Sequence, residues 1–169
     1  QYLEVFRKAG ANVVNWDINS FVDITDLKSV KRAAAAVYKK FGRIDVLVNN
    51  AAFNPQVGEK DTPESNWAPY EKFSLKVWEH ELKINLTGQL VVTQVVAPYM
   101  MKQRSGSIIF VSSDFAFMGP NNSIYGLGRF KDIAYVTSKA GVLGLMRSWA
   151  AYLGRHNVRV NALVPGGMC

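Results

Sequence analysis

The chain has 169 residues, of which 49% are hydrophobic and 20% are charged. This size and composition are typical of one globular domain with a substantial core. No apolar stretch reaches the roughly 18 residues that a membrane-spanning helix needs, and the first residues lack the pattern of a signal peptide. The single cysteine, Cys169, excludes an internal disulfide, so we expect a reducing, cytoplasmic location.

The formal net charge of +7 prompts a nucleic-acid hypothesis. The positive residues are scattered, however, and their densest groups, 28–40 and 101–104, fall on or beside predicted helices, where a solvated face explains them. No nucleic-acid-binding motif accompanies them. We therefore expect no nucleic-acid or membrane partner, and a salt-dependent shift assay tests the nucleic-acid alternative.

The first part of the chain predicts short elements. Residues 2–8 read as the end of an amphipathic helix, and 11–17 and 20–23 read as two short strands that each end in an aspartate. A helix is predicted from residue 25 or 26 to residue 41, because apolar residues recur there with helical spacing. Gly42 follows as its terminator.

The rest of the chain predicts three nearly continuous apolar strands, two long helices and two polar loops. Apolar strands of this kind are typical of a parallel sheet covered on both faces. The sequence therefore predicts a doubly wound α/β sheet with three Rossmann-like layers. In chain order the elements are strand 44–48, loop 53–74, helix 75–103, strand 107–112, loop 114–132, helix 133–153 and strand 158–164.

Polar groups gather where the predicted strands end. In doubly wound sheets, ligands bind at the carboxyl ends of the strands, so a functional site is expected at this edge. The groups concerned are Asp17, Asp23, Asn49, Asn50, Ser112, Ser113, Pro165 and Gly166.

Tyr135 and Lys139 lie four residues apart on the predicted helix 133–153 and so share one face. A cation beside a phenol lowers the phenol pKa, which can make a tyrosine a usable acid or base near neutral pH. The bare spacing is common and equally describes a half-buried tyrosine beside a solvated lysine. The surrounding residues decide between these two interpretations.

Seven segments, in order, resemble the short-chain dehydrogenase/reductase family over essentially the whole chain. The resemblance implies an NAD(P)-dependent oxidoreductase that interconverts an alcohol and a carbonyl on a small-molecule substrate. The segments are 12–17, 23–26, 44–51, 85–88, 109–113, 135–141 and 158–167.

The resemblance implies catalytic roles for four residues. Tyr135 would exchange a proton with the substrate, and Lys139 would lower the Tyr135 pKa and hold the nicotinamide ribose. Ser113 would bind the substrate oxygen, while Ser112 faces the protein, and Asn85 would hold a water that links Lys139 to solvent. The local alternatives are strand-end caps for the serines and a helix-interrupting polar residue for Asn85.

The resemblance also implies a dinucleotide site and no metal site. An acid at Asp17 would accept hydrogen bonds from the adenosine ribose 2′-OH and repel a 2′-phosphate, which favours NAD over NADP; the alternative is a plain turn aspartate. The other contacts would be Asp23 and Ile24 at adenine, Asn50 and Ala51 at the adenosine ribose, and Pro165 and Gly166 beside the nicotinamide.

Three departures from the family pattern stand out. The glycine-rich pyrophosphate loop is absent, and only three residues separate Asp17 from Phe21, where the family has a helix. We therefore expect residues 1–169 to be one Rossmann-like domain that lacks its first strand, glycine-rich loop and C-terminal part, as an incomplete view of a larger protein. Ala52 stands at a position where the family usually has glycine.

The third departure is a spacing of 22 residues between Ser113 and Tyr135, where the family has roughly a dozen. Tyr125 lies 12 residues after Ser113 and is followed at the helical spacing by Arg129. Arginine keeps its charge, and neighbouring glycines disfavour a helix there. We therefore reject Tyr125 as the catalytic tyrosine, although it could reach the substrate.

Two enlarged loops would flank the substrate pocket with amides and aromatics, which suit a sugar-like or polyol substrate. They resemble the loops of members from bacterial sugar and flagellin-glycan biosynthesis. The two long helices resemble family interfaces, which implies a homodimer or homotetramer. The alternative function is a truncated, non-catalytic relative that acts as a binding or interaction protein. The loop residues are Asn54, Gln56, Trp67, Tyr70, Asn121, Asn122, Tyr125 and Arg129.

Overall fold

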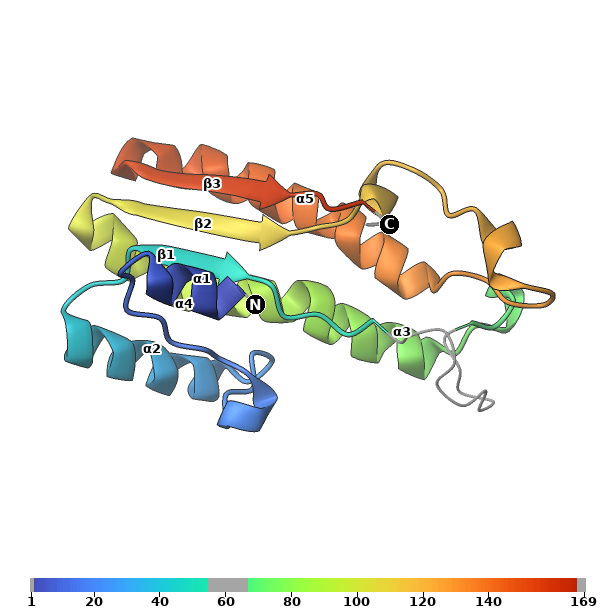
Figure 1. Ribbon diagram of the computed structural model, residues 1–169, viewed down its shortest axis with the longest axis horizontal. Helices are drawn as coiled ribbons and strands as arrows, with labels where there is room; N and C mark the ends of the chain where they lie inside the picture. Colours follow the sequence, from blue (N-terminus) through green and yellow to red (C-terminus); the bar gives the residue numbers. More distant parts are fainter. Residues whose placement is uncertain (1, 55–66, 167–169) are drawn as a thin grey trace.

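The computed structural model describes residues 2–54 and 67–166. A parallel three-stranded sheet lies at its centre, in the order β1-β2-β3, so the carboxyl ends of all three strands meet at one edge (Figure 1). The parallel sheet predicted from the sequence is confirmed. The strands are β1 (Val46–Asn49), β2 (Gly106–Val111) and β3 (Val158–Leu163).

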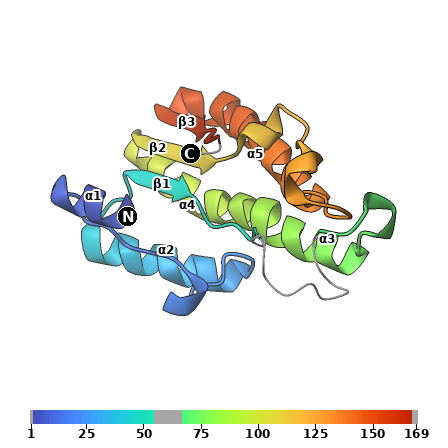
Figure 2. The same ribbon diagram turned by 45° about the vertical axis from the view of Figure 1, so that its right-hand side comes forward.

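Helices cover one face of this sheet closely. In Figures 1 and 2, α4 and α5 lie side by side along one face, α2 lies against α4, and the short α1 lies on the opposite face near β1. Val46 stays 52% exposed on that second face, whereas Phe110 is fully buried in the core. The helices are α1 (Tyr2–Lys8), α2 (Leu27–Phe41), α3 (Leu75–Leu82), α4 (Gln89–Gln103) and α5 (Ile133–Leu153).

The ends of α2 follow from local chemistry. The Asp26 carboxylate accepts hydrogen bonds from the Lys28 and Ser29 amides, which satisfies free donors in the first turn. Gly42 ends the helix at φ 73°, a left-handed conformation that glycine adopts without strain. The predicted helix is therefore confirmed.

The two short strands predicted near the N-terminus are wrong. Residues 11–16 pair with no strand in the described part of the chain, and Ile18–Ser20 form a 3-10 turn. The reason is local: the Asp17 carboxylate accepts from the Asn19 amide, and the Asp17 amide donates to the Ser20 hydroxyl, both at 2.9 Å. These bonds favour a turn over an extended ladder.

The long helix predicted over 75–103 is present but is not uniform. A π-helical segment, Lys83–Gly88, joins α3 to α4, and Pro98 lies inside α4. Segments of this kind often occur at functional sites. Among the described residues, no helix is long and apolar enough to cross a membrane.

Candidate active site

The start of α5 places Tyr135 and Lys139 at the edge where the strands end. Asp132 caps the helix by accepting hydrogen bonds from the Ala134 and Tyr135 amides at 2.7 and 3.0 Å. Lys139 Nζ lies 5.5 Å from the centroid of the Tyr135 ring. The two side chains therefore share a helix face, as their spacing predicts.

Lys139 is almost fully buried, with 3% of its surface exposed. Its Nζ donates a hydrogen bond to the carbonyl oxygen of Val111, the last residue of β2, at 2.8 Å. Burial disfavours the ammonium form and lowers the Lys139 pKa to about 8. The side chain is thus cationic at neutral pH but close to its titration range.

The two serines after β2 have different surroundings. Ser112 is buried, and its hydroxyl donates to the Lys139 carbonyl at 2.7 Å, so it faces the protein interior as expected. The Ser113 hydroxyl donates to Asp114 Oδ1 at 2.8 Å and hydrogen bonds with the Tyr135 phenol. The 22-residue spacing therefore does not separate Ser113 from Tyr135.

The Tyr135 phenol has opposing influences on its pKa. Burial raises the pKa, the hydrogen bond with Ser113 lowers it, and the negative charge of Asp114 raises it, with a net upward shift. In this structure Tyr135 is therefore a neutral phenol at physiological pH, the form that can donate a proton.

Asn85 lies fully buried in the π-helical segment. Its side-chain oxygen accepts from the Phe53 amide at 2.6 Å, and its side-chain nitrogen donates to the Phe53 carbonyl at 2.9 Å. Both ends of the Asn85 side-chain amide therefore bind the main chain of Phe53, and the role expected for Asn85, holding a water that links Lys139 to solvent, stays a prediction.

Four residues predicted to contact the dinucleotide lie at the same edge of the sheet. Asn50 and Ala51 are exposed directly after β1. Pro165 follows β3, and its carbonyl accepts from the Asp114 amide at 3.1 Å, next to Gly166. The structure thus brings these positions to the strand ends beside Ser113.

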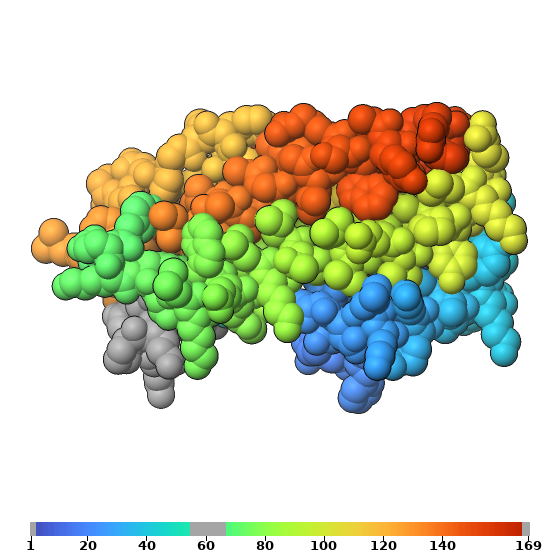
Figure 3. All heavy atoms as spheres, turned by 180° about the vertical axis from the view of Figure 1, so that it is seen from behind, coloured from blue at the N-terminus to red at the C-terminus, as the bar shows by residue number. Residues whose placement is uncertain are grey.

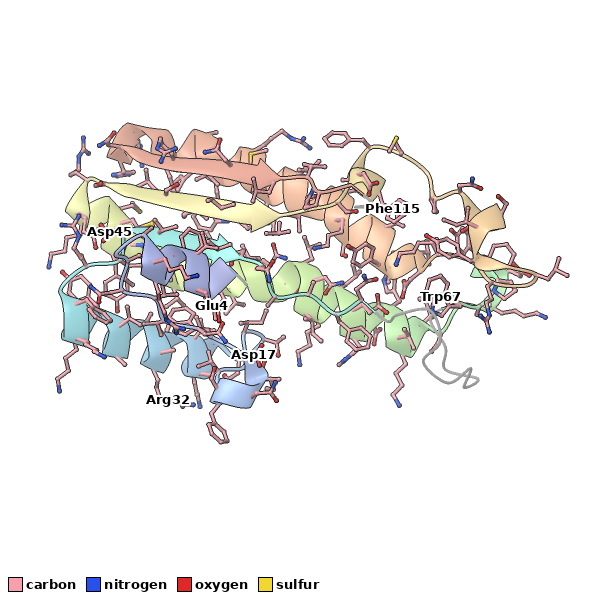
Figure 4. The ribbon with its side chains drawn as sticks, viewed as in Figure 1. Glu4, Asp17, Arg32, Asp45, Trp67 and Phe115 are labelled. Atoms are coloured by element: carbon pink, nitrogen blue, oxygen red, sulfur yellow. The ribbon has the colours of Figure 1, made fainter. Side chains whose placement is uncertain are left out.

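The other three predicted cofactor residues lie elsewhere. Asp17 is exposed beside the start of α2, away from Trp67 and Phe115 (Figure 4). Asp23 Oδ1 accepts from the amide and hydroxyl of Thr25 at 2.8 Å, and these bonds lower its pKa. Ile24 packs against the core, close to the Cα of Gly88.

Lys131 is a site residue that the sequence did not predict. It is 6% exposed, and its Nζ lies 4.4 Å from the centroid of the Tyr135 ring and 2.8 Å from Asn54 Oδ1. It belongs to a loop without helical or strand periodicity, so no pattern in the sequence indicated its burial. Asp114, which also acts on Tyr135, was missed for the same reason.

Tyr125 is placed away from the lysine pair. Its ring packs on Trp67 with centroids 4.9 Å apart, and burial raises its pKa. Gln56, Gly167 and Cys169, named in the sequence predictions, lie outside the described residues. Within residues 2–54 and 67–166, no group of three or more His, Cys, Asp or Glu side chains could hold a metal ion.

Known proteins have sequences similar to that of this chain. The 3-oxoacyl-(acyl-carrier-protein) reductase FabG of Thermotoga maritima is 37% identical over 145 residues, covering 86% of this chain and 51% of that protein. The D-threitol dehydrogenase of Mycolicibacterium smegmatis is 35% identical over 143 residues, covering 85% and 47%. The chain therefore spans about half the length of these relatives.

Solved structures agree with this comparison. The crystal structure of an NAD⁺-bound xylitol dehydrogenase matches with a TM-score of 0.71 and 30% identity, covering 87% of this chain and 50% of that one. A family model described as short chain dehydrogenase matches residues 4–169. The chain belongs to the short-chain dehydrogenase family.

Proposed function

We propose that this chain carries the catalytic centre of an NAD(P)-dependent oxidoreductase that interconverts an alcohol and a carbonyl. The observation that carries the proposal is the hydrogen bond between Tyr135 and Ser113, with the Lys139 ammonium 5.5 Å from the same ring. A proton donor, an oxygen-binding hydroxyl and a buried cation thus meet at the strand ends.

The chemistry follows from these three side chains. In the reducing direction, the Ser113 hydroxyl and Tyr135 phenol hydrogen bond the substrate carbonyl oxygen, and Tyr135 donates its proton as that oxygen gains charge. Lys139 stabilises the resulting phenolate. A bound nicotinamide dinucleotide supplies the hydride in this direction and accepts it in the other.

The strand ends fit the nicotinamide half of such a dinucleotide. Asn50 and Ala51 leave exposed main chain there, and Lys139 has three donors, of which one is used by Val111. Lys139, Pro165 and Gly166 would hold the nicotinamide side. No glycine-rich turn that would bind the pyrophosphate is present among the described residues.

Asp17 favours NAD over NADP in this proposal. Its carboxylate is exposed and would repel a 2′-phosphate. Asp23 and Ile24 would contact adenine through their main chain and exposed atoms, because the Asp23 carboxylate binds Thr25 and the Ile24 side chain packs inward.

Asn85 has an indirect role in this proposal. Its side chain ties the π-helical segment to Phe53, directly after the strand end, and so fixes the floor of the site. A water that links Lys139 to solvent would then be held by the main chain of the π-helical segment, where the regular helical hydrogen bonds are displaced.

A polyol or sugar-like substrate is the substrate class we propose. Asn54 and Trp67 lie beside Lys131, and the Tyr70 ring packs on Phe130. Amides and aromatics of this kind suit a substrate with adjacent hydroxyls. Two of the relatives described above are named for polyols, threitol and xylitol. A cytoplasmic location remains part of the proposal.

Titration of NAD against the protein expressed from its complete reading frame tests the proposal. Saturable NAD binding, weakened by Lys139→Met, is the expected result. No binding by the intact polypeptide would instead favour a non-catalytic family member that acts as an interaction protein. An Asp17→Ser variant should bind NADP at least ~10-fold better relative to NAD, a change of about 1.4 kcal/mol.

A further inference from the structure

Lys131 places a second ammonium group against the ring of Tyr135. Its Nζ lies 4.4 Å from the Tyr135 centroid, nearer than Lys139 Nζ at 5.5 Å. The centroids of the Trp67 and Phe115 rings are 5.3 and 5.9 Å from Lys131 Nζ. Both residues are labelled in the right-hand half of Figure 4. Cations this close to aromatic faces are attracted to them.

Burial and two neighbouring acids have opposite effects on the Lys131 pKa, and the net shift is downward. Burial lowers its pKa, but the negative charges of Asp132 and of Glu81 on α3 raise it. Asp132 is 1% exposed and Glu81 fully buried, so neither charge is screened by bulk water. Asn54 adds a hydrogen bond to the ammonium at 2.8 Å.

We propose that Lys131 is a second cationic positioning residue for Tyr135, and that it stabilises the phenolate left when Tyr135 gives up its proton. The catalytic meaning of this inference rests on the function proposed above, because it takes Tyr135 as the acid/base. The 4.4 Å distance runs to the ring centroid, and a cation this close to the ring favours the ionised form of the phenol over the neutral form.

Charges from several elements face Tyr135 and make this second cation useful. The Asp114 carboxylate, at the end of β2, opposes the phenolate, whereas Ser113 favours it. Lys139 and Asp132 come from α5 itself. The negative charge of Glu81 raises the Lys131 pKa, and the negative charge of Asp114 also raises the Tyr125 pKa. Since Asp114 destabilises a phenolate, Lys131 offsets that effect from the loop.

The position of Lys131 depends on how the loop 114–132 packs against the loop that contains Trp67. The Phe130 amide donates to the Trp67 carbonyl at 3.1 Å, which joins the loops immediately before Lys131. The Lys131 amide donates to Asn122 Oδ1 at 2.8 Å. The acidity of Tyr135 is therefore coupled to how these loops pack.

Nuclear magnetic resonance of ligand-free protein, labelled with ¹³C at the tyrosine Cζ, measures the Tyr135 pKa directly. A Tyr135→Phe variant assigns the signal. Lys131→Met is expected to raise the Tyr135 pKa by about 1 unit or more, and Lys131→Arg to restore most of the difference. Lys40→Met is the matched control, because Lys40 is exposed and lies 5.1 Å from the Phe41 centroid; it should leave Tyr135 unchanged.

An unchanged Tyr135 pKa in Lys131→Met overturns the inference. If that variant does not fold, the same coupling must show on the lysine, because linkage is reciprocal. The pKa of Lys131 followed by ¹⁵N resonance should then be lower in Tyr135→Phe than in the wild type, and equal values overturn the inference. Neither measurement requires turnover, so a failed activity assay leaves this test intact.

Discussion

At Lys139 the proposed catalytic role and the stability of the fold oppose each other. Burial of the Lys139 ammonium lowers the free energy of unfolding, but it also holds a cation near Tyr135. Its pKa of about 8, against 10.5 for the free side chain, means that unfolding takes up a proton between these pH values. Stability due to this group therefore rises with pH from about 8 to 10.5 and is lowest below 8.

Replacing Lys139 with methionine should stabilise the protein while removing activity. The fall of the Lys139 pKa from 10.5 to about 8 corresponds to about 3 kcal/mol, from which ~1 kcal/mol is subtracted for the lost hydrogen bond to Val111. We expect Lys139→Met to be about 2 kcal/mol more stable at pH 7 and this gap to close by pH ~10.5. Urea denaturation at both pH values measures it.

The matched variant for this experiment is Lys102→Met, which changes an exposed lysine on α4. Its free energy of unfolding should stay within about 0.5 kcal/mol of the wild type at both pH values. A Lys139→Met variant that is less stable than the wild type at pH 7 would contradict the burial argument.

The sequence predicted some site residues and could not predict others. The helical spacing brought out Tyr135 and Lys139, the strand end brought out Ser113, and the resemblance to a family implied their roles. Lys131 and Asp114 were missed because their positions depend on how two irregular loops pack against each other. Contacts between distant loop segments, such as the 2.8 Å bond from Lys131 to Asn54, have no local pattern.

At the scale of elements, the π-helical segment between α3 and α4 connects the core to the site. Gly88 ends this segment and lies against Ile24, while Asn85 holds Phe53. Gly141 on α5 faces Leu86 in the same way. Small residues thus let the segment approach both the N-terminal region and α5.

A methyl group at Gly88 should disrupt this approach. A Cβ there would lie 2.7 and 2.9 Å from Cδ1 and Cγ1 of Ile24, a stiff β-branched side chain packed on the core. We expect Gly88→Ala to lower the free energy of unfolding by about 1–3 kcal/mol, measured by chemical denaturation.

Gly144→Ala is the control for that substitution, since nothing lies within 4 Å of a Cβ at this position in α5. It should raise stability by roughly 0.5–1 kcal/mol, because alanine is the better helix former. Equal stabilities for the two alanine variants would show that the contact with Ile24 is unimportant.

The sequence predicted helices well where the spacing of apolar residues and a capping aspartate indicate the same helix start. The helices that begin at Leu27 and Ile133 follow capping aspartates, and both were predicted closely. Residues 11–17 failed because a strand requires a neighbour for its hydrogen bonds, and Asp17 instead binds Asn19 locally. Sequence periodicity does not report the presence of such a neighbour.

At the scale of the whole molecule, α4 and α5 form one continuous outer surface, visible from behind in Figure 3. Tyr152, near the end of α5, is half exposed, and its ring packs edge-on against Trp149. We propose that this surface forms the interface of a homodimer or homotetramer.

Mass measurements test the assembly and the extent of the domain together. Intact mass spectrometry is predicted to give a polypeptide heavier than the 18.8 kDa of these 169 residues. Light scattering of the native protein should then give two or four times the measured polypeptide mass. A polypeptide of 18.8 kDa would refute the expected larger domain, and a native mass equal to the polypeptide mass would refute the oligomer.

The acid/base role of Tyr135 is tested most directly by nicotinamide reduction, followed by absorbance with a panel of polyols. The wild-type protein is predicted to turn over NAD, and Tyr135→Phe to lose at least ~100-fold in kcat while NAD binding persists. Tyr125→Phe, which changes the tyrosine that packs on Trp67, should keep its catalytic step. Equal turnover by the wild type and Tyr135→Phe would contradict the assignment of Tyr135 as the acid/base.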